Sequence, residues 1–139
     1  MATGFLLDTG VVSELRKPAP DEGLVSWLGG VRTEEIFLSC LLLVELRAVA
    51  ERLRSADTDT SAALDRWLDG LTATFAERVL PVDVAVADQW GRLNGQWALN
   101  ATEGLIVATA AVHGLSVVTR NPAALLGLDV AVLNPFSSN

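Results

Sequence analysis

The sequence predicts an α/β protein in which a central, mostly parallel sheet lies between layers of helices. Short apolar runs without charged residues recur along the chain, as in strands that are buried on both faces. Longer segments with apolar residues at helical spacing separate these runs, and glycine, proline and capping residues stand at the boundaries. Strands that alternate with helices in this way form parallel sheets covered by helices.

The apolar runs give the expected strands, and the segments between them give the expected helices. The strands lie at 6–7 with its flanks, 36–39, 79–82, 115–119 and 130–133. The helices lie at 11–17, 21–30, 41–54, from the loop 56–60 to 77, 84–97 and 103–113, with a helical turn at 122–126. Pro18 and Pro20 stop the first helix, and Asp83 can cap the one that begins at 84.

Length and composition predict a cytoplasmic protein made of a single domain, residues 1–139. No apolar run approaches the roughly 18 residues needed to cross a bilayer, and no signal-peptide pattern is present, so no membrane partner is expected. The single cysteine, Cys40, excludes an intramolecular disulfide. A mean hydropathy of +0.38 is high for a soluble protein and indicates an apolar surface that a partner covers.

The formal net charge of −7 argues against nucleic-acid binding through broad electrostatic attraction. It is compatible with an enzyme acting on nucleic acid only if several acidic residues surround a cation. The positions of the acids therefore decide between these classes of function.

Two polar residues follow predicted strands. Asp8 follows the strand at 6–7, and Asn121 lies just beyond the strand at 115–119. In an open parallel sheet, ligands collect outside the carboxyl ends of the strands. Asp8 is equally suited to cap the next helix, and Asn121 precedes a proline in what can be an ordinary turn. Neither residue identifies a site by itself.

Two glutamates face the core side of predicted helices. Glu45 has no basic residue three or four positions away, so its carboxylate needs either a distant arginine or a bound cation. Glu103 matches a capping box with Asn100, yet its neighbours along the helix are apolar. If these glutamates gather with Asp8 and Asn121 at one sheet edge, their oxygens form a site that hard divalent cations prefer.

The triplet Asp8-Thr9-Gly10 also matches the active-site triplet of aspartic proteases. The aspartic-protease fold is almost entirely β, whereas a helix is expected directly after this triplet. An enzyme that phosphorylates Asp8 would usually carry a second Asp at position 10, which is Gly10 here. Both alternatives are disfavoured.

Several stretches occur in an order typical of one family: "LLDTGVVSELRKP" at 6–18, "FLSCLLLVELRAVAERL" at 37–53, "VLPVD" at 79–83, "EGLIVATAAVHGLSVVTRN" at 103–121 and "VAVLNPF" at 130–136. Through them the chain resembles the PIN-domain ribonucleases, specifically the VapC and FitB-like toxins of type II toxin–antitoxin pairs. The resemblance implies a PIN-like three-layer α/β/α sandwich and a metal-dependent endoribonuclease. The family's acids map onto Asp8, Glu45 and Glu103, which would hold Mg²⁺ or Mn²⁺, and Asn121 would orient a ligand or the attacking water.

Three positions depart from the family pattern. Gly10 replaces the Asn of the usual Asp-Thr-Asn opening, Val44 replaces the Gly that usually precedes the helix glutamate, and Glu103 stands where Asp is usual. Gly10 removes a side chain that would form a hydrogen bond within the site. These departures leave an alternative function, that of a PIN-fold binding module with a degraded site and weak or no nuclease activity.

The resemblance also implies a cognate VapB/FitA-like antitoxin and a homodimer or a toxin–antitoxin hetero-oligomer. In the family, the C-terminal segment of the antitoxin lies in a groove and often sends a basic side chain into the site. Core packing is the favoured role for most of the tryptophans that are candidate contacts: Trp27, Trp67, Trp90 and Trp97. A solvated surface position or a salt bridge is favoured over an RNA contact for the arginines that are candidate RNA guides: Arg16, Arg47 and Arg120.

Overall fold

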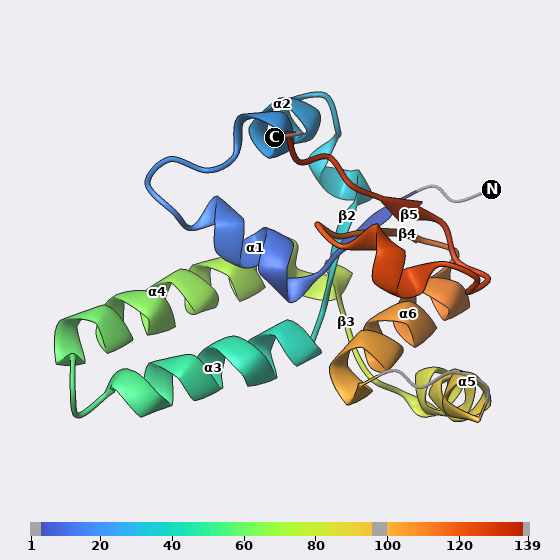
Figure 1. Cartoon of the computed structure of the whole chain (residues 1–139). Helices are drawn as coiled ribbons and strands as arrows, with labels where there is room; N and C mark the ends of the chain where they lie inside the picture. The colour runs from blue at the N-terminus through green and yellow to red at the C-terminus, as the bar shows by residue number, and fades with distance from the viewer. Residues whose placement is uncertain (1–3, 96–99, 138–139) are drawn as a thin grey trace.

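Strands and helices alternate along the computed structural model, which describes residues 4–95 and 100–137 (Figure 1). The elements are β1 (Phe5–Leu7), α1 (Thr9–Leu15), α2 (Glu22–Gly29), η1 (Thr33–Glu35), β2 (Ile36–Ser39), α3 (Leu41–Leu53), α4 (Thr58–Phe75), η2 (Ala76–Arg78), β3 (Val79–Leu80), α5 (Val84–Asn94), α6 (Ala101–His113), β4 (Ser116–Val118), η3 (Pro122–Leu125) and β5 (Val132–Leu133).

The strands form one sheet in the order β3-β2-β1-β4-β5. Every pairing in this sheet is parallel, and in the central strand Leu6 stands opposite Phe37 of β2 and Val117 of β4. The predicted α/β class and the mostly parallel sheet are therefore confirmed. The connections between parallel neighbours run through helices, as parallel pairing requires.

Successive side chains of the central strands enter two different cores, because side chains alternate between the faces of a sheet. Leu7 of β1 and Val118 of β4 pack with apolar residues of α1 to α4 on one face. Leu6 and Val117 pack with apolar residues of α6 and η3 on the other. Figure 1 shows α3 and α4 as a long hairpin on one side of the sheet and α5 and α6 on the other.

The predicted boundaries hold to within a few residues, with local corrections. The strand expected at 79–82 ends at Leu80, because Pro81 has no N–H to continue the ladder. The strand expected at 130–133 begins only at Val132. Asp83 caps α5 as predicted, accepting a hydrogen bond from the Val86 N–H at 3.0 Å. The predicted end of this helix near Trp97 lies outside the described residues.

Within the described part of the chain, no helix combines the length and apolar character that crossing a membrane requires.

Helix α6 meets α5 at a glycine that leaves no room for a side chain. A Cβ built on Gly104 would lie 1.7 Å from Cζ3 and 2.2 Å from Cε3 of Trp90, which stands on α5. Real Cβ atoms essentially never come that close to a neighbour, so the indole occupies the space that any other residue type would fill. The two helices approach closely only because position 104 is glycine.

We expect Gly104→Ala to lower the free energy of unfolding by about 1–3 kcal/mol, because the added methyl group forces the Trp90 indole out of its position. Gly70→Ala is the matched control, since Gly70 is also inside a helix but has no atom within 4 Å of a Cβ built there. The control should instead stabilise the fold by about 0.5–1 kcal/mol. Urea denaturation of both variants measures the difference, and equal effects would contradict the close α5–α6 contact.

Candidate active site

One cavity at the carboxyl edge of the sheet has a volume of about 180 Å³. Asp8 reaches it from the end of β1, Glu45 from α3, Glu103 from the first turn of α6, and Asn121 from the segment after β4. All four residues singled out in the sequence therefore line the same cavity. The remaining wall consists of Thr9, Gly10, Thr102, Ile106, Val107, Val117, Thr119, Ala124 and Leu125.

Asp8 is held by backbone hydrogen bonds on both sides. Its N–H donates to the Val118 carbonyl at 3.1 Å, which carries the β1–β4 ladder one residue beyond the strand. Its Oδ1 accepts from the Val11 N–H at 2.9 Å and so caps α1. Capping and lining the cavity are thus not alternatives for Asp8, because one carboxylate does both.

Glu45 is half-buried, and its partner is a hydroxyl group. Thr9 Oγ1 donates to Glu45 Oε1 at 2.6 Å, joining the start of α1 to α3 across the cavity wall. Among the residues that the structure describes, no lysine or arginine forms an ion pair with Glu45. The distant arginine considered from the sequence is therefore not found, and the carboxylate faces the cavity without a compensating positive charge.

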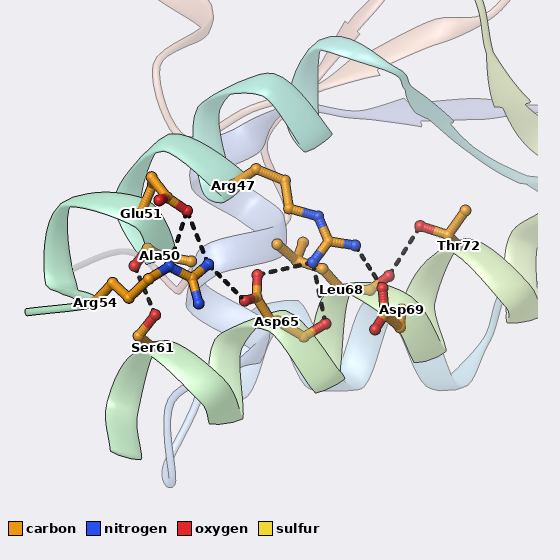
Figure 2. Close-up of polar contacts among 9 residues, drawn as sticks. All are labelled: Arg47, Ala50, Glu51, Arg54, Ser61, Asp65, Leu68, Asp69 and Thr72. Atoms are coloured by element: carbon orange, nitrogen blue, oxygen red, sulfur yellow. Dashed lines mark hydrogen bonds and ion pairs between the residues drawn. The ribbon is translucent and has the colours of Figure 1, made fainter. Parts of the chain in front are cut away.

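Two arginines, Arg47 on α3 and Arg54 at its C-cap, hold α3 against α4 (Figure 2). Arg47 donates through Nη1 to Asp65 Oδ1 at 2.8 Å and through Nη2 to Asp69 Oδ1 at 2.5 Å. Arg54 Nη2 reaches Glu51 at 2.8 Å and Asp65 at 3.3 Å. The hydrogen bond from Arg47 lowers the pKa of the Asp65 carboxyl, so this acid stays ionised at neutral pH. Arg47, a candidate RNA guide in the sequence, has a structural partner instead.

The segment that carries Asn121 is tied to α1 through a buried acid. Glu14 is only 7% exposed; it pairs with Lys17 at 2.8 Å and with Arg120 at 3.4 Å. The Lys17 ammonium, followed by the Asp21 backbone N–H, lowers the pKa of the Glu14 carboxyl. Asn121 is exposed, and its N–H donates to Thr119 Oγ1 at 3.1 Å. Arg120 is thus engaged in a salt bridge, which was its favoured role in the sequence.

The oxygen atoms around the cavity suit a hard divalent cation by type. Asp8, Glu45, Glu103, Asn121 and Thr9, whose side chains carry carboxylate, amide and hydroxyl oxygens, line one cavity. Within residues 4–95 and 100–137, however, no three His, Cys, Asp or Glu side chains stand close enough to hold a metal ion by themselves. Mg²⁺ usually keeps several waters and binds only one or two carboxylates together with substrate phosphates, so the residues present fit such an ion.

The three departures from the family pattern occupy different places around the cavity. Gly10 is exposed, and a Cβ built on it would lie 3.6 Å from Asp8 Oδ1 with no other atom within 4 Å, so a longer side chain would fit there. Val44 is 64% exposed and points away from the core. Glu103 is half-buried, and its backbone N–H donates to the Asn100 side chain at 2.8 Å.

The structure adds residues that sequence reasoning did not assign to the site. In the sequence Thr9 stood out only as part of the Asp8-Thr9-Gly10 triplet, and in the structure its hydroxyl group contacts Glu45. Trp90 was a candidate partner contact for which core packing was also considered, and it packs on Gly104 beside Glu103. The hydroxyl type of Thr9 next to Asp8 was the only available signal, because long-range partners leave no local pattern. Trp97 lies outside the described residues.

A sequence profile of the PIN domain matches residues 5–125. Toxin FitB of Neisseria gonorrhoeae is 34% identical over 137 residues, which cover 95% of this chain and 98% of that relative. The chain belongs to the PIN-domain family. A second relative, the VapC ribonuclease Y4jK of Sinorhizobium fredii, is 29% identical over 95% of this chain and 97% of its own length. The resemblance to VapC and FitB-like toxins is thereby confirmed.

Solved structures agree with this assignment to the PIN fold. The crystal structure of FitAcB from Neisseria gonorrhoeae superposes with a TM-score of 0.85 at 34% identity, covering 94% of this chain and 97% of that chain. A member of the VapBC family of toxin–antitoxin systems, VapBC-5 from Mycobacterium tuberculosis, superposes with a TM-score of 0.65 at 27% identity, covering 94% and 96%. The three-layer α/β/α architecture expected from the sequence is the architecture of this family.

Proposed function

We propose that this PIN domain is the toxin of a toxin–antitoxin pair and acts in the cytoplasm as a Mg²⁺- or Mn²⁺-dependent endoribonuclease. The observation that carries the proposal is the convergence of Asp8, Glu45, Glu103 and Asn121 on one cavity at the carboxyl edge of the sheet. The relatives named toxin and ribonuclease support the same reaction class.

The side chains of the proposed site have different roles. The carboxylates of Asp8, Glu45 and Glu103 would hold the cation, directly or through waters, and the amide of Asn121 would orient a ligand or the attacking water. When bound, the cation supplies positive charge that offsets the phosphate charge and activates water for hydrolysis of the phosphodiester. The Thr9 hydroxyl keeps the Glu45 carboxylate in one orientation, which a preorganised site requires.

The net charge of −7 is consistent with this chemistry, because the cation, rather than a basic surface, would bring the acidic site and the phosphate together. Two of the three arginines considered as RNA guides, Arg47 and Arg120, are already paired with acids. The third, Arg16, is exposed with its guanidinium 5.8 Å from the centre of the Trp67 ring. Of these three, Arg16 remains the candidate for an RNA contact.

A second surface depression, beside the cavity, has features expected of a binding site for the antitoxin. A groove of about 410 Å³ runs along α3 and is lined by Thr9, Val44, Glu45, Leu46, Ala48, Val49 and Arg52. It shares Thr9 and Glu45 with the cavity, so a segment bound there would reach the site. Its lining is mainly apolar, and Val44 is largely exposed. We therefore place the C-terminal segment of a VapB/FitA-like antitoxin in this groove.

Asp8→Asn and Glu45→Gln should each lower the rate of RNA cleavage by about 100-fold, because each removes a charge that holds the cation. Asparagine keeps the helix cap at position 8, so the loss would not reflect a broken α1. Cleavage of tRNA and structured RNA with Mg²⁺ or Mn²⁺ measures the effect, with a chelator control. Asp129→Asn, at an exposed acid that does not line the cavity, is the matched variant and should cleave normally.

Two results would contradict the proposed ribonuclease activity. Identical cleavage products from the unaltered protein and Asp8→Asn would assign the activity to a contaminant. If the unaltered protein cleaves no RNA with either metal but still binds its antitoxin, the protein is the alternative, a PIN-fold binding module with a degraded site.

Val44→Asp should weaken binding of the antitoxin by at least about tenfold, because it places a charge in the apolar groove along α3. The partner to test is a small antitoxin-like protein encoded by a neighbouring gene, and calorimetric titration gives the dissociation constant. Val25→Asp is the control, since Val25 is 49% exposed on α2 and does not line the groove. Equal dissociation constants for the two variants would show that the antitoxin binds elsewhere.

A further inference from the structure

The Trp90 side chain contacts the first turn of α6, the helix that carries Glu103. Its indole lies against Gly104, the residue that directly follows Glu103. Trp90 is half-buried and does not itself line the cavity. Its contact with the site therefore passes through the backbone of α6.

An adjacent face of α6 packs on the sheet. Ile106, Val107 and Ala110 lie in the second core with Leu6 and Val117 of the central strands. A helix in contact with the sheet on one face and with an indole on a neighbouring face has little freedom to shift, because protein interiors are close-packed. Since Gly104 brings the indole against the backbone itself, a change of ring size translates directly into a shift of the first turn.

Four residues of this helix line the cavity: Thr102, Glu103, Ile106 and Val107. The position of α6 therefore decides how far the Glu103 carboxylate extends toward Asp8 and Glu45. Glu103 is one methylene longer than the Asp usual at this position, so its oxygens reach the same place only if the backbone is held at a suitable distance.

We propose that Trp90 is a positioning residue for Glu103, fixing the first turn of α6 so that this carboxylate contributes to cation binding. The inference rests on the proposed function, in which Glu103 helps to hold the metal. Groups that orient metal-binding residues from outside typically change metal affinity by about 10–100-fold when they are altered.

The test is calorimetric titration of the full-length chain with MnCl₂ in the absence of RNA. Trp90→Leu should weaken Mn²⁺ binding by at least about tenfold, and Trp90→Phe should restore most of the affinity, because a flat ring still fills the space above Gly104. Trp27→Leu is the control. Trp27 is half-buried, packs edge-to-face on Phe5 with ring centroids 5.0 Å apart, and belongs to the core on the other face of the sheet. The Trp27→Leu variant should have a lower free energy of unfolding but an unchanged affinity for Mn²⁺.

The outcomes separate this inference from the proposed function. All variants are titrated at a temperature at which circular dichroism shows them folded. If Glu103→Gln weakens Mn²⁺ binding but Trp90→Leu does not, the metal site stands and the role of Trp90 is overturned. If Trp27→Leu weakens binding as much as Trp90→Leu, the effect is one of general stability and the role of Trp90 is again overturned. If Glu103→Gln binds Mn²⁺ as tightly as the unaltered protein, Glu103 is no ligand and the role of Trp90 is overturned, while the proposed nuclease still rests on Asp8 and Glu45.

Discussion

The parallel pairing of β1 with β2 on one side and β4 on the other is the constraint on which the rest of the structure depends. Because all three strands run in the same direction, the segments that follow them leave the sheet at the same edge. Asp8 and Asn121 follow β1 and β4, and Glu45 lies on the helix that follows β2. Residues separated by more than a hundred positions thus line one cavity.

Three carboxylates line the cavity at this edge, and hydrogen bonds hold two of them: the Asp8 carboxylate accepts from the Val11 N–H and caps α1, and the Glu45 carboxylate accepts from the Thr9 hydroxyl. Among the residues that the structure describes, no lysine or arginine forms an ion pair with Glu45, and Arg47 on the same helix is paired with α4. The arrangement leaves negative charge directed at the cavity, which is the condition under which a cation binds.

Contacts outside the cavity hold the two helices on which Glu45 and Glu103 stand. The Arg47 and Arg54 ion pairs join α3 to α4, the Ser61 hydroxyl adds a buried bond to the Ala50 carbonyl at 2.7 Å, and Trp90 holds α6. None of these groups lines the cavity, yet each bears on an element that delivers a carboxylate to it.

Local patterns in the sequence predicted much of this fold. Uninterrupted apolar runs predicted the parallel strands, and the positions of Asp8 and Asn121 after two of them predicted the sheet edge at which the cavity lies. The contact of Thr9 with Glu45 spans 36 positions, and that of Trp90 with Gly104 depends on how two helices pack. Such contacts arise from tertiary packing and have no periodic signature, so only the fold reveals them. The observed end of β3 at Leu80 differs from the predicted end at residue 82, because Pro81 has no N–H to form the next hydrogen bond of the sheet.

The most direct measurement of the central claim is anomalous scattering from crystals of this protein grown with Mn²⁺. We expect a single strong manganese peak in the cavity, within bonding distance of a carboxylate oxygen of Asp8, Glu45 or Glu103 or of a water held by them. A cavity without manganese at saturating Mn²⁺, or a peak only at surface acids such as Asp65 and Asp69, would contradict the claim that the sheet edge gathers these residues to hold a cation.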